Sequence, residues 1–564
     1  MDHTPRNRYE QRWTALKSER SSWFPHWQDL SRNLQPRSGR FFVTDRNRGG
    51  KRHNAIYDNT GTRALRTLAA GLMAGMTSPA RPWFRLTTAD SDLNAHHDTQ
   101  VWLANVRKIM LAVFARSNTY RALQHCYLEL GLFGTAGSIV LPNFQKVIHH
   151  YPHTTGEYAI ACNPEGRVDT FYREFQKPVN EVVAEYGYAN CTPGTQRLYD
   201  GGNLDAWVTL RHAIEPREDR DRTSRDARNM PWASITWEAG SPPARYLRES
   251  GFKHFRAIVP RWEAVGGDIY GASPAMDALG DVKQLQHQQL RKAQAIDQMA
   301  LPTLQAPPSM KNDGLNRIPG GVVYSEGAGA NGGVRNLYDV RLDLNHLLAD
   351  INDVRGRVNA AFYADLFLML ASMPSDGSMT ATEVAERHEE KLLMLGPVLE
   401  RLHDELLDPL ISLTFYDMLD AGLVPPPPPE MQGQPVRVEF VSTLAQAQRA
   451  VGTNSLDRFV SNLGVVARFQ PSVLDKFDGD KWVDSYADSL GVDPDLIVGD
   501  KQVALVRDAR AKQQQQAEQL AAANHMADTA QKLAQVPTGG GQQNAASDLM
   551  NQFSGYGSPS PEQY

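Results

Sequence analysis

The stretch YDNTGTRALRTLAAGLMAGMTSPARPWFRL, residues 57–86, predicts one helix followed by a loop and an aromatic anchor. Asp58 or Thr60 can cap the helix, because a side-chain oxygen there accepts hydrogen bonds from free backbone amides. Apolar side chains then recur at helical spacing, at Leu65, Leu68, Leu72 and Met76. Thr77-Ser78-Pro79 ends the run, and Pro82-Trp83-Phe84 is expected to pack on an apolar surface. The stretch contains no catalytic group.

Length and composition predict a globular chain of several parts. The 564 residues exceed what a single hydrophobic core usually contains. A hydrophobic content of 41%, a charged content of 22% and a net charge of −5 are ordinary values. The longest apolar run, residues 366–373, is too short to cross a bilayer, and the charged N-terminus is unlike a signal peptide. We therefore expect a cytosolic product with no membrane partner.

The enzymatic motifs in the sequence are weak. Residues 327–332 satisfy G-x-G-x-x-G, but residues 333–338 favour another strand instead of the helix that a dinucleotide site needs. A flexible tip is the favoured interpretation. Gly49-Gly50-Lys51-Arg52 lacks both the earlier glycine and the hydroxyl of a Walker A loop. We predict that the chain is not an enzyme, has no catalytic or cofactor-binding residues and needs no cofactor.

The cysteines and histidines give no metal motif. The three cysteines lie far apart without a C-x-x-C pair, so neither a zinc site nor a disulfide framework is expected. His149, His150 and His153 are chemically able to bind a metal, but no further ligand group follows at helical spacing. We interpret them as a surface or turn cluster and predict no metal site.

The N-terminal segment, residues 1–52, is basic and aromatic. It carries twelve Lys/Arg against five Asp/Glu, with aromatic side chains interleaved. Such a segment can contact DNA, and it can equally form a contact with a neighbouring subunit. The subunit contact is the favoured interpretation.

Periodicity predicts a mainly helical chain with a small β-rich part, that is, an α+β fold class. Helices are expected at residues 8–34, 60–76, 98–115, 273–300, 344–373 and 381–423, with shorter ones near 443–451, 454–467, 472–477 and 480–489. Strands are expected at 168–175, 206–214, 232–238, 244–248 and 436–441. Ser273 and Pro274 predict the start of the fourth helix. Residues 501–535 are weakly apolar and rich in helix formers, so we expect them to associate with copies of themselves.

Several motifs follow one another along residues 10–450. In order they are Trp27, Leu34-x-Pro36-Arg37-x-Gly39-Arg40-Phe41, Asp58 with Gly61, Gly71 and Gly75, Ser78-Pro79-x-x-Pro82-Trp83-Phe84, Tyr270-Gly271-x-Ser273-Pro274-Ala275, Met379-Thr380-Ala381-Thr382-Glu383-Val384, Leu395-Gly396-Pro397 and Phe440-Val441-Ser442-x-Leu444-Ala445. This ordered set resembles the head-to-tail connector (portal) proteins of short-tailed bacteriophages. Beyond residue 450 no motif carries the resemblance.

The resemblance implies a portal-like division of the chain into wing, stem, clip, crown and barrel. The implied parts are a wing at 1–272 with a β-rich subdomain at about 156–260, a first stem helix at 273–301, a clip at 302–340, a second stem helix at 341–371, a tunnel loop at 372–380, a wing helix and strand at 381–442, a helical crown at 443–500, a C-terminal barrel helix at 501–535 and a flexible tail at 536–564.

The resemblance also implies candidate functional residues. The DNA-facing tunnel loop would contain Ser375, Asp376, Gly377 and Ser378, the stem channel Lys283, Arg291 and Lys292, and the clip contact with terminase or tail Lys311, Arg317 and Arg335. Charges of mixed sign along the stem agree with a surface over which DNA slides, because a wall of basic residues would hold the phosphates.

The resemblance implies a function as well. A ring of twelve subunits, assembled in the host cytoplasm, would sit at one capsid vertex of the virion. It would nucleate the procapsid with scaffolding protein and major capsid protein, dock terminase during packaging, hold a tail adaptor and pass double-stranded DNA without sequence specificity. The alternative is a helical scaffold or adaptor protein without a DNA channel.

Overall fold

The computed structural model describes residues 5–45, 49–88, 90, 93, 96–224, 226–240, 246–301, 303–305, 335–336, 344–371, 395–431, 436–440, 459–490, 498 and 500–534. The chain divides into two compact units. The first comprises residues 1–90 and 102–479, and the second comprises residues 91–101 and 480–564. The fold class is α+β and mainly helical.

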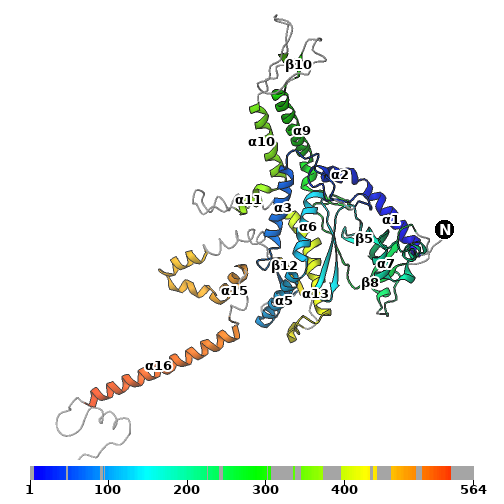
Figure 1. Cartoon of the computed structure of the whole chain (residues 1–564). Helices are drawn as coiled ribbons and strands as arrows, with labels where there is room; N and C mark the ends of the chain where they lie inside the picture. The colour runs from blue at the N-terminus through cyan, green and yellow to red at the C-terminus, as the bar shows by residue number, and fades with distance from the viewer. Residues whose placement is uncertain are drawn as a thin grey trace, which may run out of the picture. The chain divides into compact units, whose positions relative to one another are not determined.

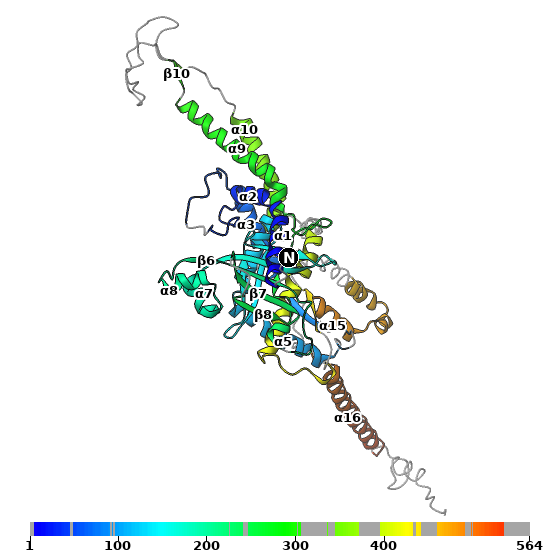
Figure 2. The ribbon, with the colours of Figure 1, turned by 90° about the vertical axis from the view of Figure 1, so that its right-hand side faces the viewer.

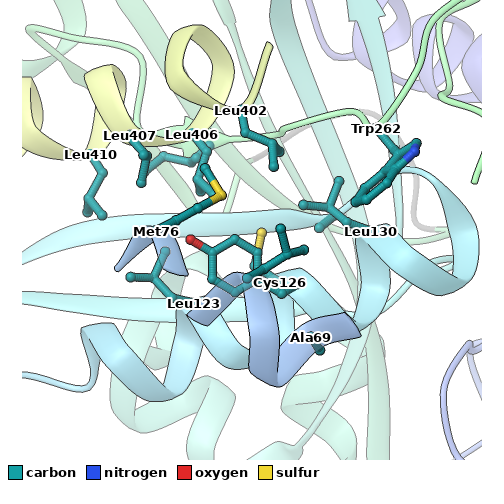
Figure 3. Packing of buried hydrophobic residues seen from close by; sticks show 14 of the residues in the cluster. Ala69, Met76, Leu123, Cys126, Leu130, Trp262, Leu402, Leu406, Leu407 and Leu410 are labelled. Atoms are coloured by element: carbon teal, nitrogen blue, oxygen red, sulfur yellow. The ribbon is translucent and has the colours of Figure 1, made fainter. Parts of the chain in front are cut away.

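The centre of the first unit is the predicted helix α3, Thr60–Met76, which packs against α6, Thr119–Phe133 (Figure 1). Its apolar stripe is fully buried, as the spacing predicted. Figure 3 shows Ala69 and Met76 of α3 beside Leu123, Cys126 and Leu130 of α6, with Leu402–Leu410 closing the other side. This cluster is the largest core in the described part of the chain, and two smaller clusters lie under α1 and beside α7.

The aromatic anchor after α3 is confirmed. Trp83 and Phe84 are both buried, and they pack against Phe114. Phe84 begins strand β1, Phe84–Thr88, which pairs antiparallel with β12, Val436–Phe440. A segment more than 340 residues away therefore returns to the end of the helix. Helix α5, His97–Arg116, follows β1 along the chain and crosses the boundary between the two units.

Two antiparallel sheets occupy the next part of the first unit. The smaller has the order β3-β2-β9, formed by Val147–His153, Gly137–Asn143 and Ala257–Ile258. The larger has the order β4-β5-β6-β7-β8, formed by Tyr158–Cys162, Val168–Pro178, Trp207–Pro216, Trp232–Glu238 and Arg248–Phe252. Helices α7, Val179–Tyr186, and α8, Pro193–Asp200, connect β5 to β6, with the short 3-10 helix η1, Tyr188–Asn190, between them. The last strand starts later than the predicted 244–248.

The N-terminal helix differs from the prediction for residues 8–34. Two helices form, α1, Pro5–Ser21, and α2, Phe24–Asn33, because Pro25 in the first turn of α2 cannot continue a preceding helix. Trp13 of α1 is buried on the larger sheet, and Trp27 of α2 is buried in the main core. Arg20 is also buried and donates to the Gly156 carbonyl at 3.0 Å. These three side chains pack within the chain. For them the predicted DNA contact and the favoured prediction of a subunit contact were therefore both wrong.

A helical hairpin projects from the core. Helix α9, Pro274–Ala300, begins where predicted, since the Ser273 hydroxyl accepts a hydrogen bond from the Met276 amide at 3.2 Å. Helix α10, Leu344–Ala361, returns alongside it in both views (Figures 1 and 2). Strands β10, Leu304–Gln305, and β11, Arg335–Asn336, pair at its far end.

The single helix predicted for residues 344–373 is instead two helices. Tyr363 has a positive φ of 53°, so the chain turns after α10 and continues as α11, Ala364–Ala371. No glycine or proline marks this turn in the sequence. Its cause is tertiary: Phe367 of α11 is buried against α3, and Gly71 makes the contact possible. A Cβ built on Gly71 would lie 2.1 Å from Cγ of Phe367.

The helix predicted at 381–423 is described from residue 395 onward. It is helical to residue 402, widens into a π-helix, η4, His403–Leu407, and continues as α13, Asp408–Asp420. Residues 459–467 are helical, Pro471–Lys476 form the 3-10 helix η6, and Gly479–Leu490 form α15. The segments 306–334, 372–394 and 443–451 lie outside the described residues.

The long C-terminal helix of the second unit is confirmed as α16, Asp500–Ala534. Its apolar side chains are exposed, among them Leu505, Val506, Leu520 and Met526. Among the described helices, none combines the length and the apolar character that a bilayer crossing requires.

The Gly71 contact gives a stability prediction. Gly71→Ala should lower the free energy of unfolding by about 1–3 kcal/mol, because the new methyl group overlaps the Phe367 ring. Gly280→Ala in α9 is the matched control. Nothing lies within 4 Å of a Cβ there, so helix propensity should leave stability unchanged or raise it by up to about 1 kcal/mol. Urea unfolding followed by tryptophan fluorescence measures both, and equal effects would contradict the close contact.

Candidate functional site

The α9–α10 hairpin is the candidate functional site, because the resemblance assigns these residues to the stem that lines a channel. Its lower half is part of the core, with Val282 and Leu285 of α9 buried beside Ile351 and Val354 of α10. Its upper half is exposed, and Ile296, Met299 and Leu301 there lie open to solvent. The hairpin is therefore a projection fixed at one end.

Asp58 fixes the base of the hairpin. Its carboxylate accepts hydrogen bonds from the Thr60 amide at 2.8 Å and hydroxyl at 2.5 Å, in front of α3. The second carboxylate oxygen accepts from Gln289 of α9 at 3.0 Å. The same oxygen also accepts hydrogen bonds from the guanidinium group of Arg355 of α10, from Nη2 at 2.7 Å and from Nε at 3.1 Å. One side chain thus joins three helices, and the sequence had identified only its capping role.

Gln286 completes the joint from α9. Its Oε1 accepts from the amides of Tyr57 at 2.6 Å and Asp58 at 2.8 Å, and its Nε2 donates to the Asp58 carbonyl at 2.8 Å. Gln286 and Gln289 are three residues apart, so they share one helix face. That spacing is visible in the sequence, but the distant partner Asp58 is not.

Two opposing effects set the pKa of Asp58. Burial favours the neutral acid and pushes the pKa upward, whereas the hydrogen bonds from Thr60 and the Arg355 guanidinium favour the carboxylate. The hydrogen bonds and the charge outweigh burial, so the pKa lies below its usual value. The carboxylate is therefore charged at neutral pH.

The three predicted channel residues of α9 have different surroundings. Lys283 forms an ion pair with Asp29 of α2 at 2.6 Å, so its charge is neutralised within the subunit. Arg291 lies 3.2 Å from the Gln294 amide oxygen and 3.5 Å from the His287 ring. Lys292 makes no hydrogen bond or ion pair in the described part of the chain. Arg291 and Lys292 therefore have no acidic partner in the described residues, whereas Lys283 is paired with Asp29.

Opposite charges also meet across the hairpin. Arg357 of α10 lies 3.5 Å from Asp281 of α9 and 3.5 Å from Asp353 on its own helix. Gln288 of α9 donates to Asp350 of α10. These pairs tie the two helices together and reduce the basic charge that the hairpin presents.

The remaining predicted site residues are less defined. Arg335 lies on β11, where its backbone pairs with Gln305. Lys311 and Arg317 lie outside the described residues, as do Ser375, Asp376, Gly377 and Ser378. The G-x-G-x-x-G run at 327–332 also lies outside them. Two residues of the following segment, Arg335 and Asn336, do form the strand that counted against a dinucleotide site.

Two of the three histidines are not at a surface or turn as interpreted from the sequence, whereas His149 is half-buried. His150 and His153 are buried on strand β3. The His150 ring lies 3.1 Å from the Thr119 hydroxyl, and burial lowers its pKa to about 4. His153 lies 3.6 Å from Glu157, and burial lowers its pKa too. Within the described residues no group of three His, Cys, Asp or Glu side chains is placed to hold a metal, and the cysteines 126, 162 and 191 are free thiols.

Comparison with known proteins adds a family. The family model described as "Bacteriophage head to tail connecting protein" matches residues 6–498. The "Probable portal protein" of Bordetella phage BPP-1 is 61% identical over 555 residues, which cover 98% of this chain and 100% of the relative. The "Portal protein" of Salmonella phage epsilon15 is 41% identical over 539 residues, which cover 95% of this chain and 97% of the relative.

Among solved structures, a chain of the "Virion of native gene transfer agent (GTA) particle" aligns with a TM-score of 0.31 and 11% identity. The alignment covers 77% of this chain and 94% of that chain. At that score the alignment supports no conclusion about fold or assembly.

Replacing Asp58 tests the joint at the base of the hairpin. Asp58→Asn should lower the free energy of unfolding by about 1–3 kcal/mol at pH 7, because it removes the charge that Arg355 binds. Because the pKa of Asp58 is lowered in the fold, its carboxylate contributes fully to the free energy of unfolding above about pH 4. The contribution is lost as the pH falls through the folded-state pKa. Arg357→Gln is the control, since its partners are more exposed and such pairs contribute about 0–1 kcal/mol. Equal losses in urea unfolding for both variants would contradict the special role of Asp58.

Burial of His150 predicts an acid-dependent loss of stability. Its pKa is lowered to about 4 in the fold, so the unfolded chain binds the proton more readily. The free energy of unfolding should therefore not depend on His150 protonation above about pH 6.5. Between about pH 6.5 and pH 4 it should fall by on the order of 3 kcal/mol. His150→Gln should lack this part of the pH dependence. Urea unfolding of both proteins between pH 7 and pH 4 measures it, and parallel curves would disprove it.

Proposed function

The chain belongs to the family of bacteriophage head-to-tail connecting proteins, and from that membership we propose that twelve copies close into a ring around a channel for double-stranded DNA. It is a portal protein, a structural component of the virion at the junction of head and tail, and not an enzyme. The match over residues 6–498 is the observation that carries the proposal. The number twelve comes from the resemblance alone.

In the ring, the α9–α10 hairpin would be the stem that faces the channel. Its charge supports this assignment, because Lys283 is paired with Asp29 and Arg357 lies near Asp281 and Asp353. Only Arg291 and Lys292 of the predicted set stay available to phosphates. Such sparse contacts suit a conduit, since each additional phosphate contact adds affinity and salt dependence.

Exposed apolar side chains support self-association. Ile296, Met299 and Leu301 near the end of α9 are 44%, 48% and 66% exposed, and Leu348 lies open on α10. A head-to-tail contact between subunits would bury them, and a head-to-tail contact that closes produces a ring. The exposed apolar residues of α16 suit the same role in a C-terminal barrel.

The finer parts of the assignment rest on the resemblance. Residues 302–340, with Lys311, Arg317 and Arg335, would form the clip that contacts terminase or a tail adaptor. Residues 372–380, with Ser375, Asp376, Gly377 and Ser378, would form the tunnel loop facing DNA. Residues 443–500 would form a crown. Scaffolding protein and major capsid protein would meet the ring during procapsid assembly in the host cytoplasm.

Ring formation distinguishes this proposal from a helical scaffold or adaptor without a channel. Purified protein should give rings with an axial hole by negative-stain electron microscopy, at about twelve copies by mass photometry. Ile296→Asp should shift the distribution toward small species, because a charge would enter the subunit contact. Gln284→Asp, an exposed polar position on the same helix, is the control and should leave rings intact. A stable monomer of the unaltered chain, with no rings after scaffolding protein is added, would reject the portal ring.

A further inference from the structure

A pocket of about 670 Å³ lies outside the helical hairpin, and none of its lining residues belongs to α9 or α10. It lies where α5 ends and α6 begins, and strand β3 forms its opposite side. Its volume is in the range of pockets that bind small organic molecules, about 300–1,000 Å³. The proposed channel uses none of the residues that line it.

The pocket carries positive charge without a counter-ion. Arg116, Arg121 and Lys146 line it, and none of the lining residues is an Asp or Glu. The side chains of these three residues form no hydrogen bond or ion pair with the described part of the chain. The three positive charges around the pocket repel one another. A bound anion would remove this unfavourable electrostatic energy. The start of the 15-residue helix α6 adds positive potential and the end of the 20-residue helix α5 adds negative potential, so the net positive charge of the pocket comes from its three basic side chains.

The wall of the pocket is held in place by hydrogen bonds. The Asn118 amide donates to the His150 carbonyl at 2.8 Å, and the His150 backbone N–H donates to the Asn118 side-chain oxygen at 2.9 Å. The His150 ring lies 3.1 Å from the Thr119 hydroxyl. These contacts join the start of α6 to β3, so Arg121 of α6 projects from a fixed frame. A preformed frame reduces the ordering cost of binding.

An aromatic pair lies beside the cations. His149 and Tyr151 are two residues apart on β3, so they lie on the same face of the strand. Their ring centroids are 4.8 Å apart at an interplanar angle of 72°, and Tyr151 is 44% exposed. Exposed aromatic rings next to basic side chains provide a surface on which a base can stack.

We propose that this pocket binds a nucleotide unit. Arg116, Arg121 and Lys146 hold its phosphate groups, and Tyr151 with His149 contacts its base. Guanidinium groups suit this role, because their N–H groups bind phosphate oxygens in pairs. The nucleotide comes either from the free pool or from an unpaired strand of DNA, and the two sources share the same chemistry. The inference does not depend on the ring or on the channel.

Fluorescence anisotropy of the full-length protein tests the proposal. The probe is a short fluorescein-labelled oligothymidylate, and the competitors are dTTP and inorganic tripolyphosphate. Tripolyphosphate carries the three phosphates of dTTP without the sugar or base and with one more ionisable oxygen, so tighter binding of dTTP cannot come from charge and reports recognition of the nucleoside. The variants are Arg116→Gln with Arg121→Gln, and Tyr151→Ala. Arg220→Gln with Arg222→Gln, in a loop away from the pocket lining, is the control with the same loss of charge.

The proposal expects dTTP to bind more tightly than tripolyphosphate. The Arg116/Arg121 variant should weaken probe binding about tenfold or more, while the loop control stays within about twofold. Tyr151→Ala should weaken dTTP about fivefold or more and leave tripolyphosphate unchanged. Displacement of the probe by dTTP at a concentration similar to the probe's own Kd identifies free nucleotide as the source, and displacement only at a much higher dTTP concentration identifies the strand.

Three outcomes overturn the proposal. The first is equal binding of dTTP and tripolyphosphate with no effect of Tyr151→Ala, which reduces the pocket to a general anion site. The second is an equal loss of binding in the Arg116/Arg121 variant and the loop control. The third is no binding of any probe by correctly folded protein. Ring counting by mass photometry on the same samples keeps these outcomes separate from the proposed portal assembly.

Discussion

The structure depends on the charged carboxylate of Asp58. It stands at the start of α3, the central core helix, and binds Gln289 of α9 and Arg355 of α10. The side chain is 5% exposed, so its charge is stable there only because hydrogen bonds and the guanidinium replace water. A projecting hairpin has little apolar contact of its own in its outer half. Its direction is therefore set by the polar joint at its base and by the buried residues just above it.

The same helix also holds the chain after the hairpin. Gly71, in the middle of α3, accepts the ring of Phe367 in α11, and the turn at Tyr363 brings that ring into place. Both helices of the hairpin, α9 and α10, and helix α11 thus attach to α3. A displacement of α3 would move all of them together, which suits a protein whose proposed work is geometric.

Buried ion pairs fix the other side of the core. Arg256 binds Asp417 of α13 through two hydrogen bonds of 2.7 and 2.8 Å, and Arg261 binds Glu405 of η4 at 3.2 Å and through its backbone amide at 2.9 Å. Each pair spans more than 140 residues of sequence. Two-point contacts between guanidinium and carboxylate fix orientation as well as distance. The segment next to β9 is therefore positioned on the π-helix and α13 by geometry that apolar packing alone does not specify.

The sequence by itself determined the fold class, several of the helices and strands, and the family, because caps, periodicity and motif order are local properties. It predicted α3, the start of α9 at Ser273 and the buried Trp83 and Phe84. Only the tertiary structure decided that Arg355 meets Asp58, that Lys283 is paired with Asp29, and that the chain turns at Tyr363. It also gathered Arg116, Lys146 and Tyr151 around one pocket. These facts depend on which distant surfaces meet, and a pairing between residues hundreds of positions apart leaves no periodic trace in one sequence.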